Sequence, residues 1–491
     1  MLFFLLLTII ICVLVMFYIK WVKVRSYWAE RGVPFDPPNP FLGSLTFLMR
    51  KNPSLWMRDI YERHRSRYVG VWLFWRPALV VNTPELARNI LVRDSGNFRN
   101  KFMTASTSDP IGSLNLLLTK DPAWTGIRKR VSLAFTSSKL KSVQAVAAAK
   151  SLDLVTRIHE EGVAEISLRT MFSDYTTDVF SAASLELDSN TTLTGEGAVR
   201  DITKEIMEFS LPRGLAWCAI FFWPDMAELF RVNFLPKKST DFLRRILRAK
   251  FKAKSVELNK DPKTVLEILM QMMRKSQDQE KAYSEDCIMA QAAALLVGGY
   301  ETTSSALTYI TYLLAHSPRQ QEKLYQELLV AEEKHGHHNM EGVIADCQYI
   351  DCVIKEALRM FPPMAWLDRV ALHDYKVDDS LTIEAGTPVY VNGVGMQVDP
   401  EFYPDPYTFD PERFTAESIP YTYMPFGDGP RICIGKRYAM ITLKNAIAAI
   451  ILNFEVLPCP NSPKPAEAEI QKKGLFLMPG EDLKVKFISR K

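Results

Sequence analysis

The residues best placed to do chemistry lie in the loop Phe426-Gly427-Asp428-Gly429-Pro430-Arg431-Ile432-Cys433-Ile434-Gly435, called here the cysteine loop. Its glycines and proline enforce an irregular backbone, and a helical pattern over residues 436–454 follows it directly. Amide N–H groups at a helix start stabilise a thiolate, so Cys433 is expected to be a metal-binding thiolate. A lone cysteine is more often a small buried hydrophobe, but that interpretation leaves the surrounding glycine and arginine spacing unexplained.

A second polar group interrupts a long apolar segment that is expected to form a helix from about Asp286 to His316. It reads Gly298-Gly299-Tyr300-Glu301-Thr302-Thr303. Each glycine costs a helix roughly 1 kcal/mol against alanine, and an acid in an apolar helix needs a partner. For this stretch alone, a kinked core helix with a satisfied threonine hydroxyl is the simplest interpretation.

Two further motifs place polar side chains at helical spacing. Glu356 and Arg359 are three residues apart and share a helix face, which on its own predicts only a surface ion pair. Trp124 and Arg128 are four residues apart, and both can donate hydrogen bonds to one acidic group. Either motif alone is a weak signal.

The elements that must position these residues are expected to be mainly helices, with a few strands. Helical patterns dominate from Ala123 to Lys334, and residues 68–75 and 77–81 are expected to be strands joined by a turn. Thr83 is expected to cap a helix that has Pro84 in its first turn. No GxGxxG fingerprint opens a helix, so an electron-consuming enzyme of this kind must be supplied by another protein.

Composition bounds the class of protein. The chain has 491 residues, 47% hydrophobic and 24% charged, which suits a large globular core. A net charge of +4 argues against nucleic acid as a partner. The seven cysteines form no CxxC pair, which argues against a disulfide framework or a structural zinc site and indicates a reducing compartment.

The N-terminus carries an uncharged run from Leu2 to Ile19, long enough to span a bilayer. Lys20, Lys23 and Arg25 follow it, and it lacks the basic n-region and the cleavage site of a signal peptide. We expect one uncleaved transmembrane helix within an anchor of residues 1–24, with the body in the cytosol. Residues 25–44 form a proline-rich hinge, either a linker or a rigid stalk, and residues 45–491 form a single domain.

The cysteine loop resembles the haem-binding signature FxxGxRxCxG of the cytochrome P450 family and matches it at every fixed position. The other motifs follow in that family's order. They are WxxxR at 124–128, the oxygen-binding groove at 298–303, ExxR at 356–359 and PERF at 411–414. The resemblance implies the cytochrome P450 fold, mainly α with small β-sheets, preceded by one N-terminal transmembrane helix. It also implies a buried structural triad of Glu356, Arg359 and Arg413.

The resemblance implies haem b (iron protoporphyrin IX) as the cofactor, with Cys433 as the metal ligand of its iron. Thr302 and Glu301 are the implied catalytic residues, Thr302 to hydrogen-bond dioxygen and Glu301 to support proton delivery. The implied cofactor site also includes residues that contact the propionates, cover the sulfur or leave room for the macrocycle. In full, it comprises Trp124, Arg128, Arg369, Phe426, Arg431, Cys433 and Gly435.

Within the family, the segments GGYETTSSAL, RMFPP and AFTSSKLK resemble insect microsomal members that metabolise xenobiotics. This implies a monooxygenase that inserts one oxygen atom of O2 into a small apolar substrate, a xenobiotic or an endogenous lipophile. NADPH–cytochrome P450 reductase is the implied partner, with cytochrome b5 as an additional one, and the membrane lipid is that of the endoplasmic reticulum, with the catalytic domain facing the cytosol. Lys436 and Arg437 are expected to dock the reductase.

Three interpretations stay open at this point. A haem-thiolate isomerase or dehydratase acting on peroxides is the first alternative to a monooxygenase, and Glu301-Thr302 argues against it. A non-catalytic haem or ligand carrier is the second. The apolar stretch from Leu215 to Phe234 is equally open, as core, as a lid over the substrate channel, or as a second membrane contact.

Overall fold

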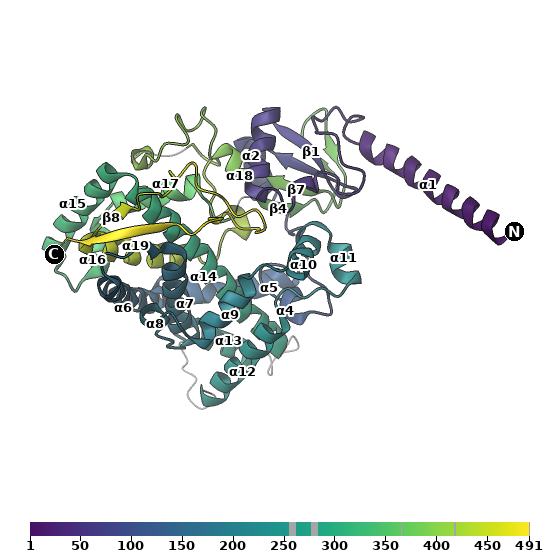
Figure 1. Ribbon diagram of the computed structural model, residues 1–491. Coiled ribbons are helices and arrows are strands. Elements are labelled where there is room, and N and C mark those ends of the chain that lie inside the picture. Colours follow the sequence, from purple (N-terminus) through teal and green to yellow (C-terminus); the bar gives the residue numbers. More distant parts are fainter. Residues whose placement is uncertain (255–261, 276–282, 365, 417–418, 491) are drawn as a thin grey trace.

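The computed structural model describes residues 1–254, 262–275, 283–364, 366–416 and 419–490. A helical body carries one helix, α1 (Leu2–Ser26), that projects alone from it (Figure 1). Two long helices cross the body, α14 (Glu285–Ala315) and α19 (Lys436–Asn453), and they pack against each other. α7 (Leu168–Leu185) lies against α14, and α6 (Ser137–Glu161) lies against α19.

The remaining described helices complete the body around this centre. The α-helices are α2 (Pro53–His64), α3 (Pro84–Arg88), α4 (Pro110–Ser113), α5 (Ala123–Val131), α8 (Thr191–Thr194), α9 (Ala198–Met207), α10 (Leu211–Phe222), α11 (Pro224–Leu229), α12 (Lys237–Lys254), α13 (Val265–Lys275), α15 (Pro318–His335), α16 (Met340–Asp346), α17 (Tyr349–Met360) and α18 (Gly393–Met396). Short turns of other helix types are η1 (Leu45–Phe47), η2 (Asn89–Arg93), η3 (Ser132–Phe135), η4 (Pro411–Phe414) and η5 (Gly429–Arg431).

α14 forms because its sequence is apolar on every face and well capped. The Ser284 side chain accepts a hydrogen bond from the Cys287 N–H at 3.2 Å, and Glu285 and Asp286 occupy the first turn. Nearly all of its 31 residues are buried, as expected for a helix without a polar face. The helix predicted from Asp286 to His316 is therefore confirmed to within one residue at each end.

Three small sheets lie beside the helices. In the largest, β1 (Tyr68–Leu73) pairs antiparallel with β2 (Arg76–Val81), β2 pairs parallel with β7 (Pro388–Val391), and β7 pairs antiparallel with β4 (Leu367–Val370). The second sheet joins β3 (Ile166–Ser167), β9 (Lys484–Ser489) and β8 (Phe454–Pro458), and the third joins β5 (Tyr375–Lys376) and β6 (Thr382–Ile383). The predicted hairpin of residues 68–81 and the predicted class, mainly α with small sheets, are confirmed.

The proline-rich segment after α1 runs along β1. The Gly70 N–H donates to the Pro34 carbonyl at 2.8 Å, and the Trp28 indole N–H donates to the Val71 carbonyl at 3.1 Å. Trp28 is fully buried, and a β-carbon on Gly70 would overlap its ring. α1 is exposed from residue 2 to residue 20 and partly buried after that, and by length and composition it could cross a membrane.

Candidate active site

The cysteine loop is a tight turn held by its own backbone. The Cys433 N–H donates to the Phe426 carbonyl at 2.8 Å, and the Asp428 carboxylate accepts from the Gly429 N–H at 2.6 Å. Gly429 has φ = +70°, and a β-carbon there would overlap the Leu91 carbonyl oxygen. This position therefore requires glycine, and the loop delivers Cys433 to the start of α19.

Cys433 is enclosed by protein and yet has an accessible side chain. Enclosure by protein and an accessible side chain are compatible because the sulfur faces an internal space and not the outer surface. Burial raises the pKa of the Cys433 thiol, while the Gly435 backbone N–H and the cations of Arg128, Lys101 and Lys436 act to lower it. A β-carbon on Gly435 would meet nothing within 4 Å, so open space also lies beside the next turn.

One face of α14 opens onto space in the same way. Beyond its first turn, α14 keeps accessible surface only at Ala294, Gly298 and Thr302, spaced four residues apart, and at Gly299 beside them. A β-carbon on Gly298 would also meet nothing within 4 Å. The Thr302 hydroxyl donates to the Gly298 carbonyl at 2.6 Å, so on this face the hydroxyl is held by its own helix.

A group of cationic side chains surrounds Cys433, and it is here called the cationic cluster. Burial lowers the pKa of Lys101 to about 8, of Lys120 to about 8 and of Arg431 to about 9. Burial also lowers the pKa of Arg128 and of Arg369. Asp368 and Asp121 are the acids that act on members of this cluster. The cluster therefore favours an anionic ligand with more than one negative group.

Two buried donors of this cluster lack a partner among the described residues. The Trp124 indole nitrogen and Nη1 of Arg431 make no hydrogen bond. The rest of the Arg431 guanidinium is fixed, with Nε donating to the Arg99 carbonyl at 3.0 Å and Nη2 to the Thr119 carbonyl at 3.1 Å. Its Cζ atom lies 3.8 Å from the centre of the Trp124 ring. Orphaned buried donors are costly, so these two N–H groups mark where a ligand's acceptor belongs.

The other implied cofactor residues lie around the same space. Arg128 Nη2 donates to the Ile432 carbonyl of the cysteine loop at 2.8 Å, and Arg369 Nη1 donates to the Asp368 carbonyl at 2.8 Å. Lys101 and Lys120 belong to the site but were not singled out from the sequence. They lie in irregular backbone with no periodic pattern, so no sequence signal separates them from surface lysines.

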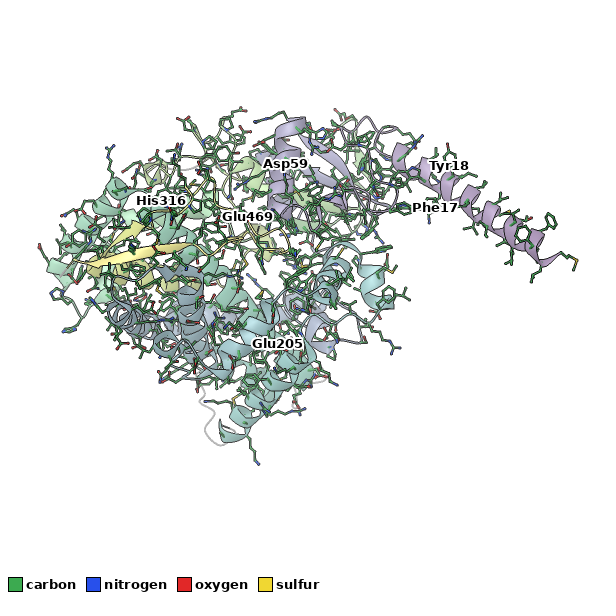
Figure 2. All side chains as sticks on the ribbon, in the orientation of Figure 1. Phe17, Tyr18, Asp59, Glu205, His316 and Glu469 are labelled. Atoms are coloured by element: carbon green, nitrogen blue, oxygen red, sulfur yellow. The ribbon has the colours of Figure 1, made fainter. Side chains whose placement is uncertain are left out.

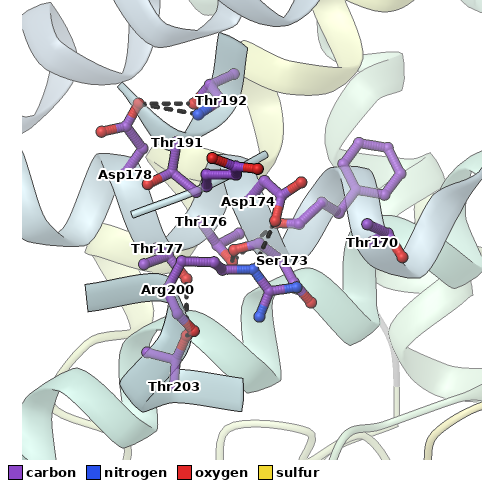
Figure 3. Close-up of polar contacts among 12 residues, drawn as sticks. Thr170, Ser173, Asp174, Thr176, Thr177, Asp178, Thr191, Thr192, Arg200 and Thr203 are labelled. Carbon is purple, nitrogen blue, oxygen red and sulfur yellow. Dashed lines mark hydrogen bonds and ion pairs between the residues drawn. The ribbon is translucent and has the colours of Figure 1, made fainter. Parts of the chain in front are cut away.

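Glu301 does not lie on the open face of α14. It is buried at 3% exposure, and its carboxylate reaches Arg169 of α7 at 3.5 Å. Burial raises the pKa of this carboxyl, and Arg169 and Arg200 act to lower it. Arg200 in turn pairs with the buried Asp174 at 2.5 Å, as Figure 3 shows. Glu301 thus belongs to a charged network between α14, α7 and α9.

The implied structural triad is present. Arg359 contacts both carboxylate oxygens of Glu356, at 2.7 and 2.8 Å, and Arg413 reaches Glu356 at 3.4 Å. Glu356 and Arg359 are fully buried. The alternative of a surface ion pair is wrong, because η4 folds over α17 and covers both residues. Arg359 also donates to the carbonyls of Gln397 and Pro406, which explains how its charge is stabilised.

These observations fit a flat macrocycle that bears two carboxylates and would be held by a thiolate. The accessible sulfur would supply the ligand, and the positions at Gly298 and Gly435, where a β-carbon would meet nothing, would leave room for the ring. The cationic cluster and the two orphaned donors would suit a pair of carboxylates. A fold of this kind with a cysteine so placed defines a haem-thiolate protein.

Comparison with known proteins agrees. The family model described as Cytochrome P450 matches residues 33–487, and the chain belongs to the cytochrome P450 family. Its relatives include Cytochrome P450 6k1 of Blattella germanica, 30% identical over 94% of this chain and 93% of that protein. They also include Cytochrome P450 6l1 of Blattella germanica, 31% identical over 90% and 89% of the two chains. Cytochrome P450 3A9 of Rattus norvegicus is 29% identical over 97% and 95%. The chain is thus a cytochrome P450 monooxygenase that uses haem.

Proposed function

We propose that this monooxygenase inserts one oxygen atom of O2 into a small apolar substrate, with haem b held by Cys433 and electrons drawn from NADPH through a separate reductase. The observation that supports this most is the accessible Cys433 sulfur within the cationic cluster. Cys433 lies just before α19, which packs against α14, the helix that carries the open face. Bound haem with a thiolate ligand supplies the activation of dioxygen.

The chain's own residues hold the cofactor through charge and hydrogen bonds. Arg128, Arg369 and Arg431, with the Trp124 indole N–H, are proposed to bind the propionates, and Lys101 is proposed to join them. Lys120 has a supporting role, because its ammonium donates to backbone carbonyls, that of Met103 at 2.6 Å, and so fixes the loop that carries Lys101. Phe426 is proposed to shield the sulfur, and Gly435 to leave room for the ring.

Thr302 and Glu301 are proposed to handle protons. Thr302 presents its hydroxyl on the open face of α14, where it can donate to a reacting oxygen in place of the Gly298 carbonyl. Glu301 lies on a buried face and contacts Arg169, which is half-exposed, so its carboxylate connects the helix to the protein exterior. We propose that Glu301 acts by supplying protons from that side and not by direct contact with substrate.

Surface features support the proposed electron supply and location. Lys436 and Arg437 are exposed at the start of α19, directly after the cysteine loop, and are proposed to dock an acidic reductase surface, with cytochrome b5 as an additional partner. We propose an anchor of residues 1–24, a hinge of residues 25–44 and one haem domain of residues 45–491. The location proposed is the endoplasmic reticulum membrane, with this domain in the cytosol.

The apolar stretch from Leu215 to Phe234 divides between core and surface. Ile220, Phe221 and Phe222 are buried, whereas Leu229 and Phe230 are largely exposed. Figure 1 places α10 and α11 at the end of the body from which α1 projects. We propose that the exposed part of this stretch is a second membrane contact and that its buried part closes the substrate side. Phe222 lines a narrow apolar crevice with Trp366 and Tyr390, which suits apolar ligands.

The experiment that tests the proposal replaces the ligand. Cys433→Ser should abolish monooxygenase activity and the red-shifted Soret band of the reduced carbon monoxide complex. Cys459→Ser, which removes a cysteine outside the site, should keep both. A red-shifted band that survives in Cys433→Ser would assign the ligand to another cysteine and refute the proposed site.

A further inference from the structure

A cleft of about 670 Å³ opens between the proline-rich segment, α2 and β1. None of its lining residues belongs to the candidate active site. The proline-rich segment contributes residues 36–40, η1 and the turn before it contribute residues 43–47, and β1 contributes residues 69–71. Asp36 of the proline-rich segment is one of the cleft's charged side chains. The other charged and aromatic side chains come from the η1–α2 region, and they are Phe47, Arg50, Lys51, Trp56, Asp59 and Arg63.

The cleft holds one cation without a partner. Lys51 pairs with Asp59 at 2.6 Å, and Arg63 pairs with Asp36 at 3.0 Å. The guanidinium of Arg50, by contrast, makes no hydrogen bond or ion pair with any described residue, and it is exposed. Three cations and two acids therefore line the cleft, and the uncompensated charge is on the side chain best suited to grip a phosphate.

The cleft also has an apolar wall next to these charges. Phe47 and Trp56 stack with their ring centres 4.4 Å apart and an interplanar angle of 21°. Ile60, Val69 and Val71 continue this wall. A ligand that fits it must carry an anionic group and an apolar portion close together, which a free inorganic anion lacks.

The rim of the cleft touches the proposed membrane anchor. Phe41, 73% exposed, follows the lining residue Pro40, and its ring lies 6.2 Å from that of Phe17. Phe17 belongs to the uncharged run of α1, and Figure 2 labels it on the projecting helix, with Asp59 of the cleft on the body. Trp75 joins the two, since its ring lies 4.7 Å from Phe17 and its indole N–H donates to the Pro40 carbonyl at 2.7 Å. The rim therefore lies at the depth where a membrane-spanning helix leaves the hydrocarbon.

We propose that this cleft binds the headgroup of an anionic phospholipid from the membrane that holds α1. Arg50 takes the phosphate, and its uncompensated charge favours a headgroup of net negative charge over a zwitterionic one. The Phe47–Trp56 wall takes the glycerol and the first part of the acyl chains. Charge and position together favour this occupant, because bilayer anions are concentrated at the surface where the rim lies. The inference rests on the proposed insertion of α1.

The test uses the full-length, haem-loaded protein, stripped of lipid in a neutral detergent. Native mass spectrometry would count bound phosphatidylserine and phosphatidylcholine of identical acyl chains, with inorganic phosphate as competitor. Phosphatidylserine should bind more tightly, and Arg50→Gln should weaken it about tenfold, the effect of one charge-assisted hydrogen bond. Arg88→Gln, at an exposed arginine of α3 outside the cleft, should leave it unchanged. A phosphatidylserine with a photoreactive headgroup should label residues 36–63.

Three results would overturn the inference. These are equal binding of the two lipids, binding indifferent to Arg50→Gln, and displacement by inorganic phosphate at micromolar concentration, which would mark a site for free anions. Insertion of α1 is measured separately, by resistance of the vesicle-bound protein to alkaline carbonate extraction. Loss of that resistance would refute the anchor, whereas loss of Arg50-dependent binding refutes the cleft alone.

Discussion

The adjacent glycines of α14 meet opposite surroundings, which makes them a matched pair for mutation. A β-carbon on Gly299 would lie 2.5 Å from Cδ2 of Phe180, whereas one on Gly298 would meet nothing within 4 Å. Phe180 has little freedom to retreat, because it is 3% exposed and its ring lies 5.9 Å from that of Tyr438. The same methyl group should therefore be excluded at Gly299 and accommodated at Gly298.

The magnitude follows from two opposing terms. Alanine in place of glycine inside a helix stabilises it by about 1 kcal/mol, and this gain is common to both variants. Overpacking against Phe180 costs about 1–3 kcal/mol and applies to Gly299→Ala alone. The propensity gain cancels in the comparison, so Gly299→Ala should be about 1–3 kcal/mol less stable than Gly298→Ala.

The assay is urea unfolding of both variants and the parent, followed by far-UV circular dichroism, with haem content measured on the same samples. Gly298→Ala should match or exceed the parent in stability and keep its haem. A larger side chain in Gly298→Leu should leave the fold intact yet reduce substrate-induced spectral shifts, because it fills the open face. Equal destabilisation by the two alanine substitutions would refute the assignment of Gly298 to an open space and of Gly299 to a packed one.

The remaining predictions concern protons, partners and the membrane. Thr302→Ala should bind haem and substrate but divert reducing equivalents to peroxide, and an unchanged ratio of product to NADPH would remove Thr302 from the mechanism. Lys436→Glu with Arg437→Glu should slow reductase-driven turnover at low salt and spare turnover driven by added peroxide; equal loss of both would mean that these residues support the haem site. Deleting residues 1–24 should release much of the protein from membranes with haem binding intact. Residual attachment that disappears with Phe230→Asp would confirm a second contact, and attachment unaffected by that change would exclude Phe230.

Helices and strands whose pattern lies within one short stretch of sequence were predicted closely. The capped apolar run of α14, the helix after the cysteine loop and the β1–β2 hairpin all appear within one or two residues of the expected bounds. Thr83 caps α3 as expected, accepting from the Leu86 N–H at 3.5 Å. The parallel pairing of β2 with β7 could not be predicted in this way, because it joins strands about 300 residues apart and leaves no local trace.

Some features of the site could not be predicted because they depend on interactions between residues far apart in the sequence. Glu301 was expected to support proton delivery, which stays a prediction, but its placement could not be predicted. One residue turns the helix by about 100°, so Glu301 and Thr302 leave α14 in different directions. The partner of Glu301 is Arg169, 132 residues earlier, and nothing in the sequence connects them. Lys101 could not be predicted for the same reason, since the fold alone brings its charge near those of Arg369 and Arg431, which are distant in sequence.

The cationic cluster links the cofactor to the stability of the fold. Like charges held together in a poorly solvated interior oppose folding, and the lowered pKa values of Lys101, Lys120 and Arg431 express that cost. Asp368 cannot offset it alone, because its single negative charge faces Lys101, Lys120 and Arg431 together. A ligand bearing two carboxylates would remove the repulsion and satisfy the orphaned donors of Trp124 and Arg431 in one step. Cofactor binding should therefore stabilise the fold, because a ligand that binds only the native state stabilises that state.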